Sequence, residues 1–445
     1  MDRINILTFA PLFSLFNAMK KLFLLFVLAL AFLPATADEY TDPATKVVYS
    51  YEPGSGIARV GYRDGSGPGS PDAKGEIAIL ERFTVDGQEY VVDMIYNHAF
   101  TDNKAITAVT VPPTVQEICS EAFMRCSSLT SVSFSEGLKR IWMSAFDGSG
   151  VTSLELPDGL EEIEMCAFAH CNRLKSVRIP SNIGRISEEA FIFCDSLETI
   201  VVDEGNDRLD SRDGCNAIVL RQSPDDLSTL LETIPEEYHE ELISLWRTDV
   251  LLLGCGGTVI PSSVGTIAGK AFYSCTSLKG EMVIPDSVVS IESEAFYLCK
   301  NLKRVTLPQS LSFIGANAFM RSGLETVTIP SGVKNIQSQA FAYIPTLTRI
   351  TSLIEEPLDL SMPICDETGY DTVTLYVPTG TKEKYMAAEG WKDFAHIVEI
   401  DKSSVNDAIV ETDAARSPVY DLQGRRLSGE PTKGMYIKDG RKYAK

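Results

Sequence analysis

Apolar residues recur along this chain three positions apart and then two apart. Between Ser290 and Pro308 they are Ala295, Phe296, Cys299, Leu302, Val305 and Leu307. Between residues 99 and 341 the Ala-Phe pair of this stretch occurs nine times, with its aromatic residue at Phe100, Phe123, Phe146, Phe168, Phe191, Phe272, Phe296, Phe319 and Phe341. Successive copies are 22 to 24 residues apart, except for one interval of 81 residues after Phe191. Such a period is typical of a solenoid, in which each coil covers the apolar face of its neighbour.

The pattern within one copy predicts the path of one coil. In "LKSVRIP", Val177 and Ile179 alternate with Ser176 and Arg178, so a strand here directs its apolar side chains inward and its polar ones outward. The proline that follows ends the ladder because it has no N–H to donate. A second apolar pair, in "SNIGRI", turns the chain back before the next Ala-Phe pair fills the far side of the coil. We therefore expect parallel stacked short strands joined by short turns.

The repeat unit resembles that of a known family. Written as A-F-x-x-C-x-x-L-x-x-V-x-I-P, it is similar to the BspA-like leucine-rich repeats of bacterial cell-surface proteins, and the resemblance extends over residues 74–400. It implies a leucine-rich repeat solenoid with short helical turns and a period of about 23 residues. We expect the repeats to occupy residues 97–352.

Both ends of the solenoid are predicted to be covered. Residues 38–96 have strand composition, and Asp86-Gly87 favours a hairpin turn, so this region is expected to form a β-rich N-terminal cap. Residues 353–400 resemble the closing unit of the family, with Trp391 and Phe394 over the last coil.

The interval of 81 residues contains a degenerate repeat. The segments around Cys215 and Cys255 resemble a repeat of the family in which two strands form a hairpin. Between them, residues 223–247 are acidic and show helical periodicity on both sides of Pro235, which predicts an insert of two short helices that protrudes from the solenoid.

The first and last segments indicate export. Lys20-Lys21, an apolar run and Ala35-Thr36-Ala37 predict a signal peptide at 1–37 with cleavage after Ala37, and translation is expected to start at Met19. The apolar run is too short to anchor the mature chain in a membrane. A linker is expected at 401–417. Residues 418–445 are predicted to form two strand pairs, around Gly424 and Asp439-Gly440. They resemble a sorting domain of the type IX secretion system. This resemblance implies that the type IX export machinery is a partner, and that the protein is secreted, extracellular or on the outer-membrane surface.

Composition excludes several function classes. The formal net charge of −21 disfavours nucleic acid as a partner, because binding to nucleic acid relies on basic side chains. The sequence has no G-x-S-x-G motif, no metal-ligand spacing among its four histidines and no complete phosphate loop. It therefore predicts no catalytic residues, no metal and no cofactor, and a protein that is not an enzyme.

Ten cysteines in an exported chain raise the question of disulfides. Five of them occupy one repeat position: Cys126, Cys171, Cys194, Cys275 and Cys299. We interpret these as a column of buried thiols with weak hydrogen bonds to the turn backbone. Neighbouring coils could still bring some of them together. Cys215 and Cys255, which flank the hairpin, are the best candidates for a disulfide.

The outward residues of the predicted strands are small and polar. The candidate binding ribbon consists of Ser131, Ser133, Ser153, Glu155, Ser176, Arg178, Arg304, Thr306, Thr326 and Thr328. One interpretation is a solvated sheet face on which hydroxyl residues suit β structure. The other is a surface that binds an extended partner, as solenoids often do.

We expect a non-enzymatic protein that binds a protein or glycan partner at the bacterial surface, and the family resemblance implies adhesion. An alternative is a scaffold or accessory subunit of a surface glycan-uptake assembly. A hydrolase is a third hypothesis, and it would need a convergent pair of carboxylates on the ribbon.

Overall fold

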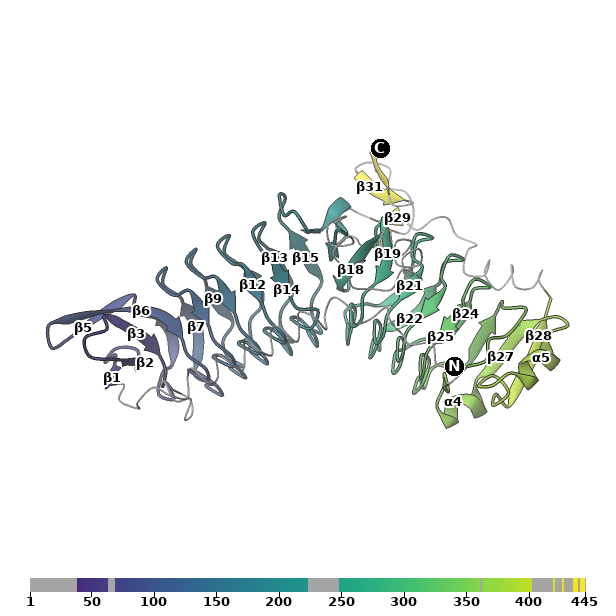
Figure 1. The fold of residues 1–445 in the computed structure, drawn as a ribbon, viewed down its shortest axis with the longest axis horizontal. Coiled ribbons are helices and arrows are strands. Elements are labelled where there is room, and N and C mark those ends of the chain that lie inside the picture. Colours follow the sequence, from purple (N-terminus) through teal and green to yellow (C-terminus); the bar gives the residue numbers. More distant parts are fainter. Residues whose placement is uncertain are drawn as a thin grey trace, which may run out of the picture.

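The computed structural model describes residues 38–62, 69–222, 248–360 and 362–401, together with four short strands between residues 419 and 444. Over these residues the chain forms the predicted solenoid of parallel stacked strands, with very little helix (Figure 1). The expected signal peptide, the insert at 223–247 and the linker after residue 401 lie outside the described residues. No helix in the described part of the chain is long and apolar enough to cross a membrane.

The predicted strands line one side of the N-terminal arm, which is residues 38–222. They are β4 (Gly75–Ala78), β7 (Ile106–Thr110), β9 (Ser131–Ser133), β11 (Ser153–Glu155), β13 (Ser176–Ile179) and β15 (Thr199–Val202). The same side of the C-terminal arm, residues 248–401, carries β20 (Gly280–Val283), β22 (Leu302–Thr306), β24 (Thr326–Ile329), β26 (Arg349–Ser352), β27 (Thr374–Pro378) and β28 (His396–Ile400). We call this side the long-strand face.

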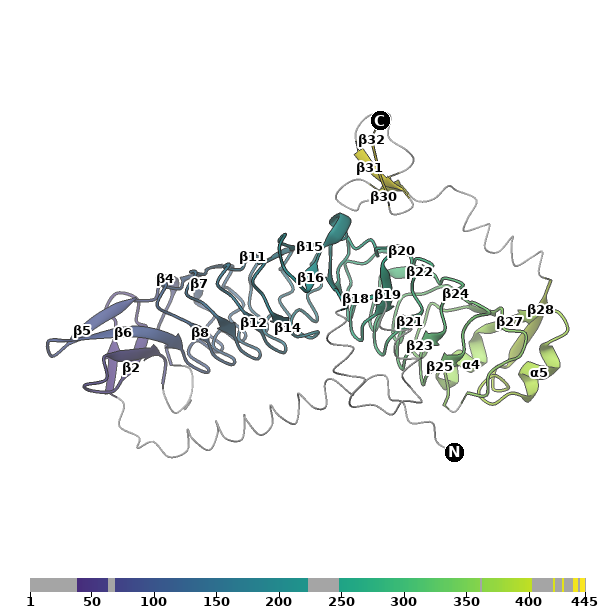
Figure 2. The same ribbon diagram turned by 45° about the horizontal axis from the view of Figure 1, so that its top comes forward.

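A second ladder runs along the opposite side of the solenoid, the short-strand face (Figure 2). In the N-terminal arm it consists of β8 (Glu117–Ile118), β10 (Arg140–Ile141), β12 (Glu162–Ile163) and β14 (Arg185–Ile186). In the C-terminal arm it consists of β19 (Val264–Ile267), β21 (Ser290–Ile291), β23 (Phe313–Ile314) and β25 (Asn335–Ile336). The second apolar pair of each copy, interpreted from the sequence as a reversal of the chain, thus also supplies a strand.

The Ala-Phe segments are hydrogen-bonded turns and not the short helical turns that the sequence predicted. The Phe N–H donates to the carbonyl of the Ala in the next coil, for example from Phe296 to Ala318 over 2.7 Å. Residues on either side have left-handed backbone conformations, as at Glu294 (φ 62°) and Leu298 (φ 59°). These φ values turn both N–H groups towards the next coil, where they bind Ala316 and Met320. The turn is therefore built for stacking, and a helix would direct these donors within its own segment.

The Phe rings form a stacked column inside each arm. Phe100, Phe123, Phe146, Phe168 and Phe191 stack in the N-terminal arm, and Phe272, Phe296, Phe319 and Phe341 stack in the C-terminal arm. Ring centroids lie 4.9–5.6 Å apart and the rings are nearly parallel. The spacing of the coils, about 4.8 Å between neighbouring strands, is what permits this contact in every coil.

Strands cap the N-terminal end. Three strands form an antiparallel group: β1 (Asp38–Thr41), β2 (Val48–Tyr51) and β3 (Ile57–Val60). β3 pairs in parallel with β6 (Gln88–Ile95), and β6 pairs with β8. The cap thereby continues the short-strand ladder. β5 (Arg82–Val85) pairs antiparallel with β6. Asp86 and Gly87 between them both have positive φ, as the two-residue hairpin turn requires.

A hairpin separates the two arms. β17 (Ala217–Leu220) pairs antiparallel with β16 (Leu209–Asp210) and with β18 (Asp249–Gly254), and β18 pairs in parallel with β19. The side chains of these strands pack on both cores: they alternate along β17, and a register irregularity between β17 and β18 places the two halves of β18 on different cores. Ile218, Leu253 and Cys255 belong to the core of the N-terminal arm, and Ala217, Val219 and Leu251 belong to that of the C-terminal arm. The hairpin is thus a wedge with two buried faces, which explains its nearly continuous apolar sequence.

Helices and short strands close the C-terminal end. α4 (Glu367–Thr372) and α5 (Lys382–Ala387) lie beside β27 and β28, as Figure 1 shows. Trp391 and Phe394 are buried in the core, and the Trp391 indole N–H donates to the Leu358 carbonyl at 2.9 Å. Further along, β29 (Val419–Tyr420) pairs with β30 (Arg426–Leu427), and β31 (Met435–Lys438) pairs with β32 (Arg441–Ala444), both antiparallel.

The repeated cysteines are buried and hydrogen-bonded, as interpreted from the sequence. Cys126, Cys194 and Cys299 donate their S–H to the carbonyls of Phe100, Phe168 and Phe272 at 3.0–3.1 Å. Burial raises the pKa of the Cys126 thiol to about 12. Asn103 and Ser149 occupy the same repeat position. The Asn103 side-chain amide donates to the Ser70 and Ala73 carbonyls, and the Ser149 hydroxyl forms a hydrogen bond with the Cys171 thiol. Most copies therefore have a small buried donor at this position, whereas the last copy has Ile344 and the buried Ser322 hydroxyl has no hydrogen-bond partner among the described residues.

Cys215 and Cys255 lie at the base of the wedge as free thiols. Their S–H groups are directed at the Ala217 carbonyl, at 3.8 Å, and at the Asn216 carbonyl, at 3.3 Å. Burial raises the pKa of both thiols to about 12. The disulfide between them stays a prediction.

We expect the Gly254→Ala variant to be less stable than the wild type by about 1–3 kcal/mol. A Cβ at this position would lie 2.1 Å from the Phe272 ring, so the wedge or the ring column would have to shift. Urea denaturation followed by circular dichroism measures the change. Gly184→Ala is the matched control, because its Cβ would meet only the Glu161 carbonyl oxygen, at 3.7 Å. Equal stability of the two variants would contradict the tight contact at the wedge.

Thiol counting tests the cysteine assignments. Raised pKa values keep the buried thiols protonated, so we expect very slow reaction with a disulfide reagent at pH 8 in the native protein, since only the thiolate attacks. In denaturant without reductant, ten reactive thiols would exclude a bridge between Cys215 and Cys255, whereas eight would support it. A variant with serine at both positions is the control, because its count should be eight with or without reductant.

Candidate binding surface

The long-strand face carries every residue of the predicted ribbon. Ser131, Ser133, Ser153, Glu155, Arg304 and Thr306 are exposed, and Ser176, Arg178, Thr326 and Thr328 are partly buried. The inward residues between them, such as Leu154, Val177 and Val327, are buried. The side chains therefore alternate as the sequence predicts.

The strand register aligns these residues in two outward rows. In the N-terminal arm, Ser176 pairs with Ser153 on one side and with Thr199 on the other, and Glu155 pairs with Arg178. In the C-terminal arm, Arg304 pairs with Thr326, which pairs with Arg349. Residues that are 22 or 23 positions apart in the sequence are thus neighbours on the surface, about 4.8 Å apart.

The ribbon is not one continuous ladder. It is divided into β4-β7-β9, β11-β13-β15 and β20-β22-β24-β26-β27-β28. Between β9 and β11 the strands do not pair, although Thr152 donates its N–H to the Thr130 carbonyl at 3.3 Å. Between β15 and β20 lies the wedge. The strands of the expected long ribbon therefore belong to three separate ladders on one side of the solenoid.

The charged residues of the ribbon differ in what holds them. The Arg178 guanidinium forms ion pairs with Asp203 and, at 3.6 Å, with Asp158, so it is fixed within its own arm. Arg304 has no ion-pair partner among the residues that the structure describes, and its side chain is exposed. The C-terminal surface thus offers a more available cation than the N-terminal one.

Sequence reasoning missed the apolar and aromatic residues of this face. Val201, Val283 and Val398 are 40–44% exposed, and all three lie on its strands. The Arg349 guanidinium lies 4.6 Å from the centre of the Tyr376 ring. Strands β27 and β28 extend the ladder beyond the repeats, which the alternation in "TVTLYVP" could have indicated.

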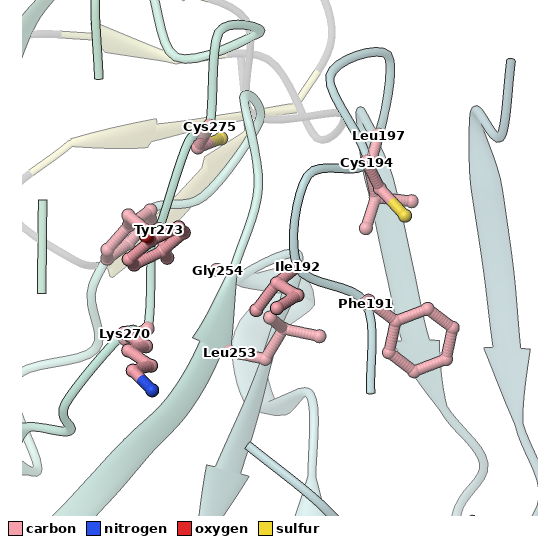
Figure 3. Close-up of a pocket in the computed structure, with 11 residues that line it drawn as sticks. Phe191, Ile192, Cys194, Leu197, Leu253, Gly254, Lys270, Tyr273 and Cys275 are labelled. Atoms are coloured by element: carbon pink, nitrogen blue, oxygen red, sulfur yellow. The ribbon is translucent and has the colours of Figure 1, made fainter. Parts of the chain in front are cut away.

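One small cavity lies where the two arms meet the wedge. The cavity in Figure 3 lies beside the wedge and measures about 10 Å³, room for one water molecule at most. Its labelled lining includes Phe191 and Leu197 from the last coil of the N-terminal arm, Leu253 from the wedge, and Lys270 and Tyr273 from the next coil. No cluster of three or more metal-binding side chains occurs among the described residues.

Comparison with known proteins agrees with this architecture. The model of the BspA type leucine rich repeat region matches residues 93–213 and 257–355, with six copies. No curated protein matches the chain.

The chain is also similar to solved structures of bacterial proteins. The pneumococcal vaccine antigen PcpA is 18% identical, with a TM-score of 0.53 over 82% of this chain and 98% of that chain. A leucine-rich repeat protein from Bacteroides ovatus is 20% identical, with a TM-score of 0.49 over 83% of this chain and 77% of that one. A leucine rich cell surface protein from Faecalibacterium prausnitzii is 21% identical, with a TM-score of 0.41 over 83% and 97%. From its repeat sequence, its stacked coils and the matching family model, the repeat region of this chain is a leucine-rich repeat solenoid that is similar to the BspA type over residues 93–213 and 257–355.

Proposed function

We propose that this protein is exported and binds a protein or glycan partner at the bacterial surface through its long-strand face. The observation that carries the proposal is the register of that face, which aligns outward hydroxyl groups in rows across successive strands. The role is adhesion, which the resemblance to the BspA-like proteins implies.

The chemistry of the face suits distributed contact with an extended partner. Each Ser or Thr hydroxyl both donates and accepts a hydrogen bond, and the rows repeat these groups at strand spacing. The exposed valines and the Arg349–Tyr376 pair add apolar and aromatic contact area. Affinity would then arise from many modest contacts along several coils.

The raised pKa values of the cysteine thiols fit a binding protein better than an enzyme. The thiols whose pKa is raised to about 12, such as Cys126 and Cys215, are core residues directed at backbone carbonyls. A catalytic thiol needs the opposite shift. The long-strand face itself is a sheet surface, on which a small substrate would not be enclosed.

Export is proposed to use both ends of the chain. The basic and apolar segment before Asp38 would direct secretion and be removed, and residues 418–445 would be recognised by the type IX machinery. The antiparallel pairs β29–β30 and β31–β32 are compatible with a small separate sorting unit.

The double variant Thr326→Arg and Thr328→Arg should reduce binding at least tenfold, which is about 1.4 kcal/mol. Two long, positively charged arginine side chains on β24 would keep a partner away from the long-strand face of the C-terminal arm. The chain from Asp38 to its end is first screened against extracellular matrix proteins and glycans, and surface plasmon resonance then compares the variants. Asn335→Arg is the control, because it alters the opposite face of the same coil.

Absence of any saturable binding, or equal affinity of the two variants, would refute the proposed surface. Saturable binding only to envelope proteins of the native cell would instead support a scaffold of a glycan-uptake assembly.

Truncation after Ser417 should retain the protein in the periplasm of the native cell. Residues 38–401 form the solenoid without contribution from the tail strands, which pair with one another, so folding should be unaffected. Cell fractionation with an antibody to the solenoid measures the location, and thermal melting of the truncated chain checks its fold. Unchanged surface display of the truncated chain would show that the tail is not a sorting signal.

A further inference from the structure

The short-strand face of the N-terminal arm carries a row of alternating charges. Glu117, Arg140, Glu162 and Arg185 are aligned by strand pairing, Arg140 with Glu117 on one side and Glu162 on the other, and Glu162 with Arg185. Each precedes an inward Ile in its coil. We call these four residues the charged row. The corresponding row of the C-terminal arm, Thr266, Ser290, Phe313 and Asn335, has no charge.

Contacts within the arm hold the charged row in place. The Glu162 carboxylate pairs with the Arg140 Nε at 2.8 Å and with an Arg185 guanidinium nitrogen at 2.6 Å. The Trp142 indole N–H donates to the Glu117 carboxylate at 2.8 Å, and the Arg140 guanidinium lies 4.9 Å from the Trp142 ring centre. The two arginine side chains nevertheless remain 39% and 48% exposed, so they can contact a partner without breaking these bonds.

The row lies in a hollow of about 390 Å³ beside exposed apolar side chains. The hollow is lined by the four charged residues together with Lys139, Glu161 and Gly184. Met143 and Met165, which follow the strands of Arg140 and Glu162, are 38% and 45% exposed. Arginine, tryptophan and methionine are the residues that protein interfaces enrich, and the corresponding coils of the C-terminal arm do not repeat this composition.

We propose that this face binds the same face of a second copy of the chain, with the two solenoids antiparallel. A row of four alternating charges is self-complementary under a two-fold rotation. Glu117 of one copy would then face Arg185 of the other, and Arg140 would face Glu162. A parallel arrangement in register would place like charges opposite one another. The sequence of charges therefore selects the two-fold symmetry that most protein dimers adopt.

The size of the surface predicts weak and reversible association. Four coils at about 4.8 Å spacing extend over only about 14 Å, which is less than a standard interface needs. We expect a dissociation constant in the micromolar range or above. Two-fold pairing through this face would leave the long-strand face of both copies free, so the inference does not depend on the proposed function.

Sedimentation velocity tests the pairing with the chain from Asp38 to its end, at about 1–500 µM. We expect a reversible monomer–dimer equilibrium that weakens in about 0.5 M salt, where charges are screened over a few ångströms. The double variant Arg140→Glu and Arg185→Glu has a row of one sign and should shift the dissociation constant upward at least tenfold. A monomer at all concentrations, or a dimer that this variant leaves unchanged, would overturn the proposal.

A charge-swapped variant separates pairing from folding. Changing Glu117→Arg, Arg140→Glu, Glu162→Arg and Arg185→Glu restores an alternating row, so dimerisation should return. The matched control, Lys334→Glu with Asn335→Glu, changes charge on the short-strand face of the other arm and should leave the equilibrium as in the wild type. Failure of the swapped variant to dimerise while its thermal melting remains cooperative would refute the charge pairing, and so would an equal effect of the control.

Discussion

The hydrogen bond from the Phe N–H of one coil to the Ala carbonyl of the next, which joins neighbouring repeat copies within each arm, is the constraint on which the solenoid depends. It fixes the distance between coils, and at that distance the Phe rings stack with centroids about 5 Å apart. The same spacing lets the buried thiols reach the Phe carbonyls. The left-handed residues on either side of the pair cost backbone energy, about 1–2 kcal/mol each for a residue with a side chain. Interactions between neighbouring coils must offset that cost, so one coil would not be stable by itself.

The wedge shows what happens where this interaction is interrupted. Phe191 and Phe272 do not stack, and the Ala271 carbonyl accepts its hydrogen bond from Gly254 on β18 instead, at 2.8 Å. The hairpin thus takes the place of a coil in the hydrogen-bond pattern while its side chains pack into both cores. Links across the joint, such as Ser277 Oγ to the Leu197 carbonyl at 2.7 Å and the ion pair of Lys270 with Glu189, tie the arms together. The fold therefore accommodates the longer interval between Phe191 and Phe272 while the wedge covers the end of each core.

The two faces of the solenoid offer different chemistry because they lie on different strands of the same coil. Long strands alternate apolar and polar residues over four or five positions, which leaves outward rows of hydroxyl groups. Short strands have a single outward position before their Ile, and in the N-terminal arm that position alternates in charge. One side thus suits an extended partner, whereas the other suits a surface with matching charges. Neither property is needed to build the coil, so both are free to serve recognition.

The sequence alone determined the coil: its period, its inward residues, its cap, its column of thiols and the hairpin between the arms. It could do so because these features follow from local spacing, and the same spacing is repeated nine times. Tertiary structure decided what the repeat left open. The second ladder, the breaks in the ribbon and the extension through β27 and β28 depend on which backbone groups meet between coils. The charged row likewise exists only after stacking, because Glu117 and Arg185 are distant in the sequence and become part of one surface through the strand register.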